Sequence, residues 1–229
     1  MSDHHAHHEH HESGHSRGHG NDQGLNGALR YLRSAPRMWR SDINNAVVDM
    51  VDPQPNERIV DIGAGMGAGT VVAARSGASV IAVEPTPFLR RVLRVRRILQ
   101  RNRVNISVVD GAAEQLPSAD SGVDAIWAVN TMHHWLDPER GAAEISRALR
   151  PGGRVLLVDE DFTDPTHPKF EQFGGDHEEE GHHHGFSMVD ADRMGALLTS
   201  AGLVQVDAGR RSIAGRPSIV ISGYAPSTS

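Results

Sequence analysis

A glycine-rich turn directly follows a short apolar segment in the first third of the chain. Residues 58–62 read RIVDI, and residues 63–70 read GAGMGAGT. β-Branched side chains suit a buried parallel strand, and glycine lets the backbone turn sharply so that its N–H groups approach a ligand closely. The pattern therefore predicts a nucleotide-type binding site formed by Gly63, Ala64, Gly65 and Gly67.

Two acidic residues bear on the cofactor that this turn would bind. Residues 63–68 fit the dinucleotide pattern G-x-G-x-x-G/A, in which a pyrophosphate lies on a helix N-terminus. Asp61, two residues before the first glycine, would repel a pyrophosphate but could pair with an ammonium group. Glu84, after the apolar residues 80–83, has the spacing expected for a carboxylate that binds ribose hydroxyls. Glu84 suits NAD and S-adenosylmethionine (SAM) equally, whereas Asp61 favours SAM, which has an ammonium, a sulfonium and no phosphate.

Strand-like and helix-like segments alternate along most of the chain. This alternation predicts a doubly wound, Rossmann-like α/β fold with a parallel sheet, and the short connection between the last two strands predicts an antiparallel strand at the end of that sheet. Two short helices, at residues 25–33 and 41–51, are expected before the first strand. The predicted strands cover residues 58–62, 80–83, 105–110, 123–129, 154–159, 203–206 and 217–224.

An arginine-rich helix is predicted to begin at Pro87 and to end near residue 101. Its apolar residues Phe88, Val92, Val95 and Leu99 are expected to form the packed face. Seven arginines lie between residues 90 and 103 with no acidic residue among them. We interpret them as a solvated outer face. An acidic partner or nucleic acid is the alternative, and the lack of interleaved aromatic residues argues against nucleic acid.

Histidines are concentrated in two polar segments. Residues 1–24 form a tail with almost nothing apolar to bury, which predicts disorder, and the loop at residues 167–186 is rich in histidine and glutamate. Imidazole at this density can bind Zn, Ni or Cu ions, so both segments are candidate metal-binding appendages. The alternatives are a solvating tail or an expression tag, and a solvated acidic loop. The candidate ligands are His4, His5, His7, His8, His10, His11, His177, His182, His183 and His184.

Composition narrows the classes of protein to which the chain can belong. The 229 residues include no cysteine, which excludes disulfides, thiolate metal sites and thiol nucleophiles. The formal charge of −6 gives no overall attraction to nucleic acid. No apolar run of about 18 residues is present, so we expect no membrane partner and a cytoplasmic protein. Residues 25–229 are expected to form one domain, and the sequence does not indicate its oligomeric state.

Four motifs in order carry a family resemblance. Residues 60–67 (VDIGAGMG) and the pair Val83-Glu84 are followed by residues 111–117 (GAAEQLP), with Val123-Asp124 after them, and by residues 148–153 (ALRPGG). Together they resemble the class I SAM-dependent methyltransferases, particularly the small-molecule group that includes the ubiquinone/menaquinone-type C-methyltransferases. The resemblance covers residues 56–224. A nicotinamide dehydrogenase would not be expected to show the third and fourth motifs.

The resemblance implies a fold and a set of cofactor contacts. It implies a seven-stranded sheet with a reversed last strand, in which the glycine turn borders the methionine moiety, Asp61 supports the amino group and Glu84 binds the ribose. Gly111, Ala112 and Ala113 would border the adenine, and Asn130 would flank the methionine carboxylate or the methyl group. The family often has aspartate where this chain has Ala112, so the contact to the adenine amino group would be lost, taken over by Asp110 or left to water.

The implied reaction is methyl transfer to a small molecule. Displacement at a sulfonium mainly requires that acceptor, carbon and sulfur are aligned and that water is excluded, so a base is needed only for acceptors that lose a proton. His133 and His134 follow the fourth strand and are the candidate bases, or else they shape the pocket and cap the next turn. The alternative function is a metal-buffering protein that keeps the fold without transferring methyl groups.

Overall fold

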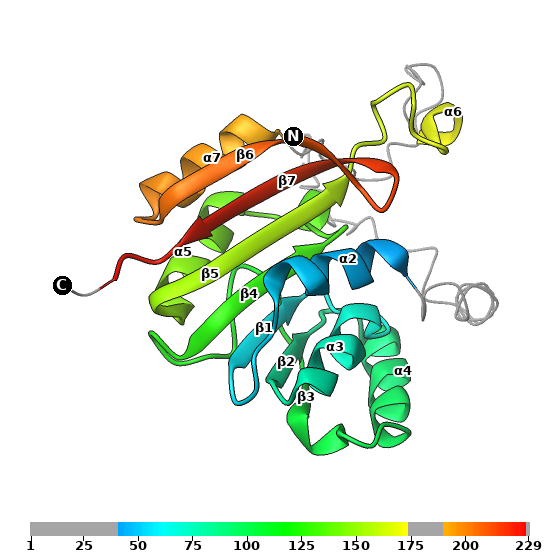
Figure 1. Ribbon diagram of the computed structural model, residues 1–229, viewed down its shortest axis with the longest axis vertical. Helices are drawn as coiled ribbons and strands as arrows, with labels where there is room; N and C mark the ends of the chain where they lie inside the picture. Colours follow the sequence, from blue (N-terminus) through cyan, green and yellow to red (C-terminus); the bar gives the residue numbers. More distant parts are fainter. Residues whose placement is uncertain (1–40, 174–189, 228–229) are drawn as a thin grey trace, which may run out of the picture. The chain divides into compact units, whose positions relative to one another are not determined.

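Seven strands form one sheet in the computed structural model, which describes residues 41–173 and 190–227. The strand order is β3-β2-β1-β4-β5-β7-β6 (Figure 1). The tail at residues 1–24, the helix predicted at residues 25–33 and most of the histidine-rich loop lie outside the described residues. The strands are β1 (Arg58–Ile62), β2 (Ser79–Val83), β3 (Ile106–Val109), β4 (Val123–Val129), β5 (Leu149–Glu160), β6 (Val204–Ile213) and β7 (Arg216–Tyr224).

The first five strands are parallel, and β7 is antiparallel to both of its neighbours. The expectation of a reversed last strand is confirmed, but its predicted place at the end of the sheet is wrong, because β7 lies between β5 and β6. The reason is burial. Residues 218–221 of β7 are all buried, as suits an inner strand, whereas most of β6 is exposed or half-buried, as suits an edge.

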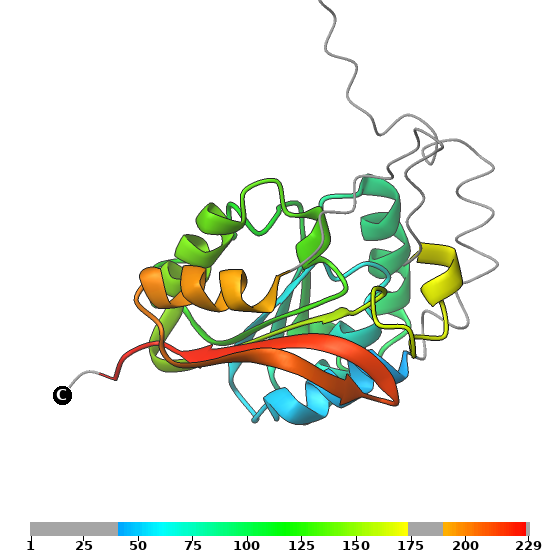
Figure 2. The same ribbon diagram turned by 90° about the horizontal axis from the view of Figure 1, so that it is seen from above.

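Helices cover both faces of the sheet (Figure 2). On one face, α2 and α3 pack around Trp127 of β4, which is fully buried. On the other, α5 and α7 pack over Ile126 and Leu157. The described helices are α2 (Asp42–Val51), α3 (Ala68–Ala73), α4 (Pro87–Ile98), α5 (Pro138–Ala148), α6 (Phe170–Phe173) and α7 (Ala191–Ser200), with 3₁₀ turns η1 (Ala74–Ser76), η2 (Arg103–Asn105) and η3 (Met132–His134).

The packed face of α4 differs from the one predicted. Val95 and Leu99, expected inside, are 62% and 72% exposed, whereas Arg90, Leu93 and Arg96 are buried. The cause is the surface that α4 covers, which consists of backbone turns with carbonyl groups that need donors. Two arginine side chains supply those donors, so the helix turns its charged residues inward at these two positions.

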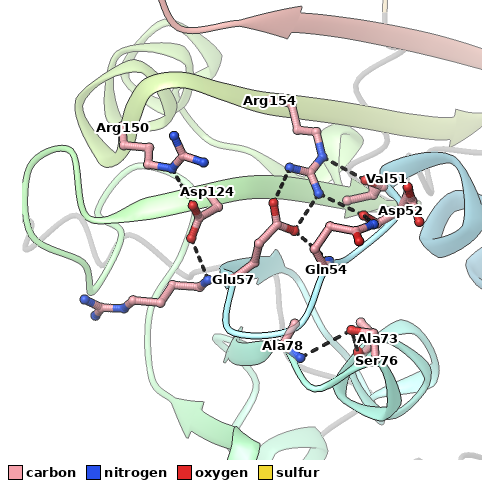
Figure 3. Close-up of polar contacts among 11 residues, drawn as sticks. Val51, Asp52, Gln54, Glu57, Ala73, Ser76, Ala78, Asp124, Arg150 and Arg154 are labelled. Atoms are coloured by element: carbon pink, nitrogen blue, oxygen red, sulfur yellow. Dashed lines mark hydrogen bonds and ion pairs between the residues drawn. The ribbon is translucent and has the colours of Figure 1, made fainter.

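Arg154 of β5 joins three segments at the amino-terminal ends of the central strands (Figure 3). Its guanidinium donates to the carbonyl oxygens of Val51 and Asp52 at the end of α2, at 2.7 and 3.1 Å, and to both carboxylate oxygens of Glu57, at 2.8 and 2.7 Å. The hydrogen bonds from Arg154 hold the pKa of Glu57 below its usual value. Arg154 therefore satisfies the last carbonyls of α2 and fixes that helix to the sheet.

We predict that Arg154→Met lowers the free energy of unfolding by about 2 kcal/mol, because it removes charged hydrogen bonds and leaves Glu57 half-buried without its cation. Arg150→Met is the matched control, since Arg150 lies on the same strand but its side chain is 50% exposed and pairs with Asp124. Its loss should cost under about 1 kcal/mol. Urea unfolding followed by circular dichroism measures both; equal losses would contradict the role given to Arg154.

Candidate cofactor site

The glycine turn lies at the carboxyl end of β1, where the strand order reverses. β1 pairs with β2 on one side and with β4 on the other, so loops leaving β1 and β4 diverge to opposite faces of the sheet. In open α/β sheets ligands bind at such a switch point. Gly63, Gly65 and Gly67 have φ angles of 67°, 54° and 77°, a left-handed region that glycine adopts readily. The predicted turn is therefore present and depends on its glycines.

Two of these glycines are in close contact with neighbouring elements. A Cβ on Gly63 would lie 2.3 Å from Thr131 Oγ1, beyond the end of β4, and one on Gly67 would lie 2.2 Å from Leu93 Cδ1 on α4. The turn is thus held between β4 and α4, and its backbone can approach a ligand without side chains in the way.

Arg90 and Arg96 of α4 anchor the loops of the site, a role that the sequence analysis missed. Arg96 donates to the carbonyl oxygen of Met66 in the glycine turn at 2.9 Å, and burial lowers its pKa to about 10. Arg90 donates to the carbonyl oxygens of Glu84 and Pro85, at 2.7 and 2.6 Å. Arg90, Leu93 and Arg96 are spaced by three residues and therefore lie on one helix face. This spacing could have indicated their shared inward position, but the many other arginines of the helix obscured it.

Glu84 connects the end of β2 to the glycine turn. Its side chain is buried, with one carboxylate oxygen accepting from the Gly65 N–H at 2.8 Å and the other from the Thr86 N–H at 2.8 Å. A carboxylate offers about four acceptor positions, so each oxygen keeps capacity for a hydroxyl of a ligand. Glu84 therefore lies beside the glycine turn, as its position after β2 predicted.

Asp61, the last but one residue of β1, is buried beneath the turn. Thr70 Oγ1 donates to its Oδ2 at 2.5 Å. Burial raises the pKa of Asp61 to about 7, and the nearby Glu84 also raises it, while the hydroxyl of Thr70 and the indole of Trp127 act in the opposite direction. Because opposite charge favours the ionised form, a cation bound near Asp61 would lower this pKa again.

The segment predicted to border the adenine follows β3. Ala112 and Gln115 form an isolated bridge, and Ala113 is buried. Within residues 41–173 and 190–227 the N–H of Ala113 donates no hydrogen bond, so it is available to a ring nitrogen. Asp110, the candidate substitute for an acid at Ala112, forms an ion pair with Arg90 at 2.8 Å, and that pair fixes its carboxylate near the loop of Glu84.

Asn130 joins the ends of β4 and β5. Its φ is 53°, its Nδ2 donates to Glu160 Oε1 at 2.7 Å, and its Oδ1 accepts from the Glu160 N–H at 2.8 Å. The side chain is therefore engaged in holding the two strands together. Its contact with the methionine end of a cofactor stays a prediction.

His133 is held by Asp159, a residue that the sequence analysis did not identify. Asp159 is buried at the end of β5 and accepts from the N–H groups of Thr131 and Met132, at 2.9 and 3.3 Å. It also contacts His133 twice, through the backbone N–H at 3.2 Å and through Nδ1 at 2.7 Å. His133 and Asp159 are 26 residues apart in the sequence, so no local motif could predict their contact. His134 stacks at a tilt on His133, with ring centres 4.1 Å apart, and is itself exposed.

His167 belongs to the histidine-rich loop and is buried. Its Nδ1 accepts from the Lys169 N–H at 3.1 Å, which leaves Nε2 to donate to Glu160 at 3.0 Å. Both ring nitrogens thus have protein partners. Among the described residues, no group of three or more His, Asp or Glu side chains could hold a metal ion. All the histidines proposed as metal ligands, in the tail and at 177 and 182–184, lie outside the described residues.

We predict that Gly67→Ala destabilises the protein more than Gly215→Ala does. Both glycines have nearly the same φ, 77° and 75°, so both variants incur the left-handed strain of about 1–2 kcal/mol. Only the Cβ at residue 67 meets another group, Leu93 of α4; nothing lies within 4 Å of the one at residue 215. Chemical unfolding should show a further loss of about 1 kcal/mol for Gly67→Ala, and equal losses would mean that α4 does not press on the turn.

Comparisons with known proteins agree with this geometry. Residues 60–157 match the methyltransferase domain family. An uncharacterized methyltransferase of Mycobacterium tuberculosis is 37% identical over 111 residues, which are 48% of this chain and 43% of the relative. A demethylmenaquinone methyltransferase of Renibacterium salmoninarum is 33% identical over 134 residues, or 58% of this chain and 52% of the relative. The chain thus spans about half the length of these relatives.

Solved structures share the fold at low sequence identity. Haemonchus contortus phosphoethanolamine N-methyltransferase 2 in complex with SAM has a TM-score of 0.67 at 14% identity over 90% of this chain and 58% of its own. The [4+2]-cyclase SpnF has a TM-score of 0.64 at 16% identity, covering 80% of this chain and 81% of its own. No helix within the described residues is long and apolar enough to cross a bilayer. The sequence matches identify a methyltransferase domain at residues 60–157, and with the strand order and the glycine turn they support a class I SAM-dependent methyltransferase of the menaquinone-methyltransferase-like group.

Proposed function

We propose that the chain binds SAM at the carboxyl ends of β1 and β2 and transfers its methyl group to a small-molecule acceptor. The observation that carries the proposal is the buried Glu84 carboxylate, which accepts from the Gly65 N–H of the glycine turn and keeps acceptor capacity for a ligand hydroxyl. The family gives the reaction class, and the fold alone does not, since a cyclase shares it.

Charge supports SAM over a dinucleotide. Asp61 and Glu84 are both buried beside the turn, and within the part of the chain that the structure describes neither forms an ion pair with Lys, Arg or His. Glu84 suits the ribose of either cofactor, whereas Asp61, next to the turn, disfavours a pyrophosphate and favours the ammonium charge of SAM. When bound, SAM supplies an activated methyl group; Glu84 would hold its ribose, the turn its methionine end and Ala113 its adenine.

Isothermal titration with SAM tests this proposal. The native protein should bind SAM, and Glu84→Gln should weaken binding about tenfold or more, because hydrogen bonds to a charged acceptor contribute about 1.5–3 kcal/mol. Glu139→Gln is the control, since Glu139 is an exposed acid on α5 and its loss should leave the affinity unchanged. A native protein that is folded but does not bind SAM, or a Glu84→Gln protein that binds as tightly, would contradict the assignment.

We further propose that His133 removes a proton from the acceptor, with Asp159 as its positioning residue. Asp159 fixes the imidazole through Nδ1, so a neutral ring held this way carries its proton on Nδ1 and its basic lone pair on Nε2. Such a pair suits an oxygen, nitrogen or carbon acceptor that loses a proton on methylation. Its place beyond the end of β4, next to the glycine turn at Thr131, supports this role.

His133→Gln should lower kcat by about 10²-fold or more while the Kd for SAM stays the same, because the loss concerns proton transfer and not cofactor binding. His134→Gln, at the exposed neighbour, should change kcat little. Radiolabelled methyl transfer from SAM measures both, with demethylmenaquinone as the first acceptor to test in view of the relatives that carry its name. Equal effects of the two substitutions would contradict the assignment to His133.

We also propose, from sequence alone, that the tail at residues 1–24 and the histidine-rich loop bind a divalent metal as appendages to the enzyme. Deletion of residues 1–24 should remove most of the Zn²⁺ capacity measured by titration while SAM affinity is kept. If the deletion leaves Zn²⁺ binding unchanged, the tail is not a metal site; if SAM binding is never detected and only metal binding follows the tail, the metal-buffering alternative is favoured.

A further inference from the structure

Exposed aliphatic residues lie on α4 and on the 3₁₀ turn that follows it. Val95 is 62% exposed, Ile98 66% and Leu99 72%, and Val104 in η2 is 80% exposed. Single large aliphatic side chains are common on protein surfaces, whereas groups of them exposed to water are unusual and often mark a contact surface. Four of them on one helix and its continuation suggest a surface used for contact.

Arginines surround these aliphatic residues. Arg91, Arg94, Arg101 and Arg103 are exposed, and none of them forms an ion pair within residues 41–173 and 190–227. No acidic residue occurs between residues 85 and 109. The chain as a whole has a formal charge of −6, so this positive surface is local and opposes the net charge. We call it, with the four aliphatic residues, the α4 outer face.

Helix geometry places both kinds of residue on the same side. Arg91 and Val95 are four residues apart, as are Arg94 and Ile98, so each arginine neighbours an aliphatic side chain. The opposite side of the helix is committed to the cofactor site through Arg90, Leu93 and Arg96. With respect to residues 41–173 and 190–227, the outer face is therefore the side of α4 that is exposed to a partner.

We propose that the α4 outer face binds the surface of a lipid bilayer that contains anionic lipids. The aliphatic side chains would enter the boundary between headgroups and acyl chains, while the arginines reach the lipid phosphates with their long side chains. Such binding lies on the membrane and needs no spanning helix. It departs from the expectation of no membrane partner, which considered only a spanning segment.

A bilayer fits this face better than the two other anionic partners. Nucleic acid would bind the arginines but would leave four aliphatic side chains without a partner, since base stacking needs aromatic rings. An acidic protein would have to offer a preformed groove in which the helix face could lie, whereas the surface of an anionic bilayer accommodates such a face without one. The inference is independent of methyl transfer. If it holds, α4, about 10 Å across, would lie between the lipid and the glycine turn that Arg96 contacts.

Sedimentation with unilamellar vesicles tests the inference on the full chain. The protein should bind vesicles of phosphatidylcholine with phosphatidylserine, bind those of phosphatidylcholine alone much more weakly, and dissociate as salt is raised. Arg91→Gln combined with Arg94→Gln should weaken binding about fivefold for each arginine removed, and Val95→Ser combined with Ile98→Ser should weaken it even at low salt.

Arg193→Gln is the matched control, because Arg193 is an exposed arginine on α7, away from α4 in both views, and its loss should leave vesicle binding unchanged. Circular dichroism melting and SAM affinity confirm that each variant is folded. Absence of binding by the native protein, equal loss in the Arg193→Gln protein, or tighter binding to duplex DNA than to vesicles at the same phosphate concentration would overturn the inference.

Discussion

Buried carboxyl groups at one edge of the sheet are the constraint on which the site depends. Asp61, Glu84 and Asp159 stand at the carboxyl ends of β1, β2 and β5, and each needs donors because it is removed from water. Thr70 supplies one donor to Asp61, the N–H groups of two loops serve Glu84, and the backbone after β4 with His133 serves Asp159. Satisfying these acids is what fixes the turn, the ribose-side loop and the imidazole in place.

The helix α4 ties this edge together from outside the sheet. Its inward arginines bind backbone carbonyls of the glycine turn and of the loop after β2, and Leu93 packs on Gly67. Because arginines occupy two of the inward positions of the helix, the aliphatic residues Val95, Ile98 and Leu99 are left on the outside. One amino-acid arrangement thus explains both the rigidity of the cofactor turn and the surface that we assign to a bilayer.

Short sequence patterns predicted the features of the structure that depend on residues close together in the chain. The glycine turn, Glu84 and the alternation of strands and helices were readable because each rests on a short pattern or a periodicity. The packed face of α4 was not, since periodicity assumes apolar residues inside and the buried surface here required donors. Asp159 and the inner place of β7 were missed because they depend on pairing between residues far apart in the chain.

The central claim, a site built for a cationic cofactor around a buried acid, is tested most directly by the pH dependence of SAM affinity. Burial raises the pKa of Asp61 to about 7, so at lower pH a bound ammonium must first displace a proton. Titration calorimetry should show affinity rising as pH increases through about 7, with protons released on binding, and both effects should disappear in Asp61→Asn. An affinity that does not change over this range, or the same change in Asp61→Asn, would contradict the account.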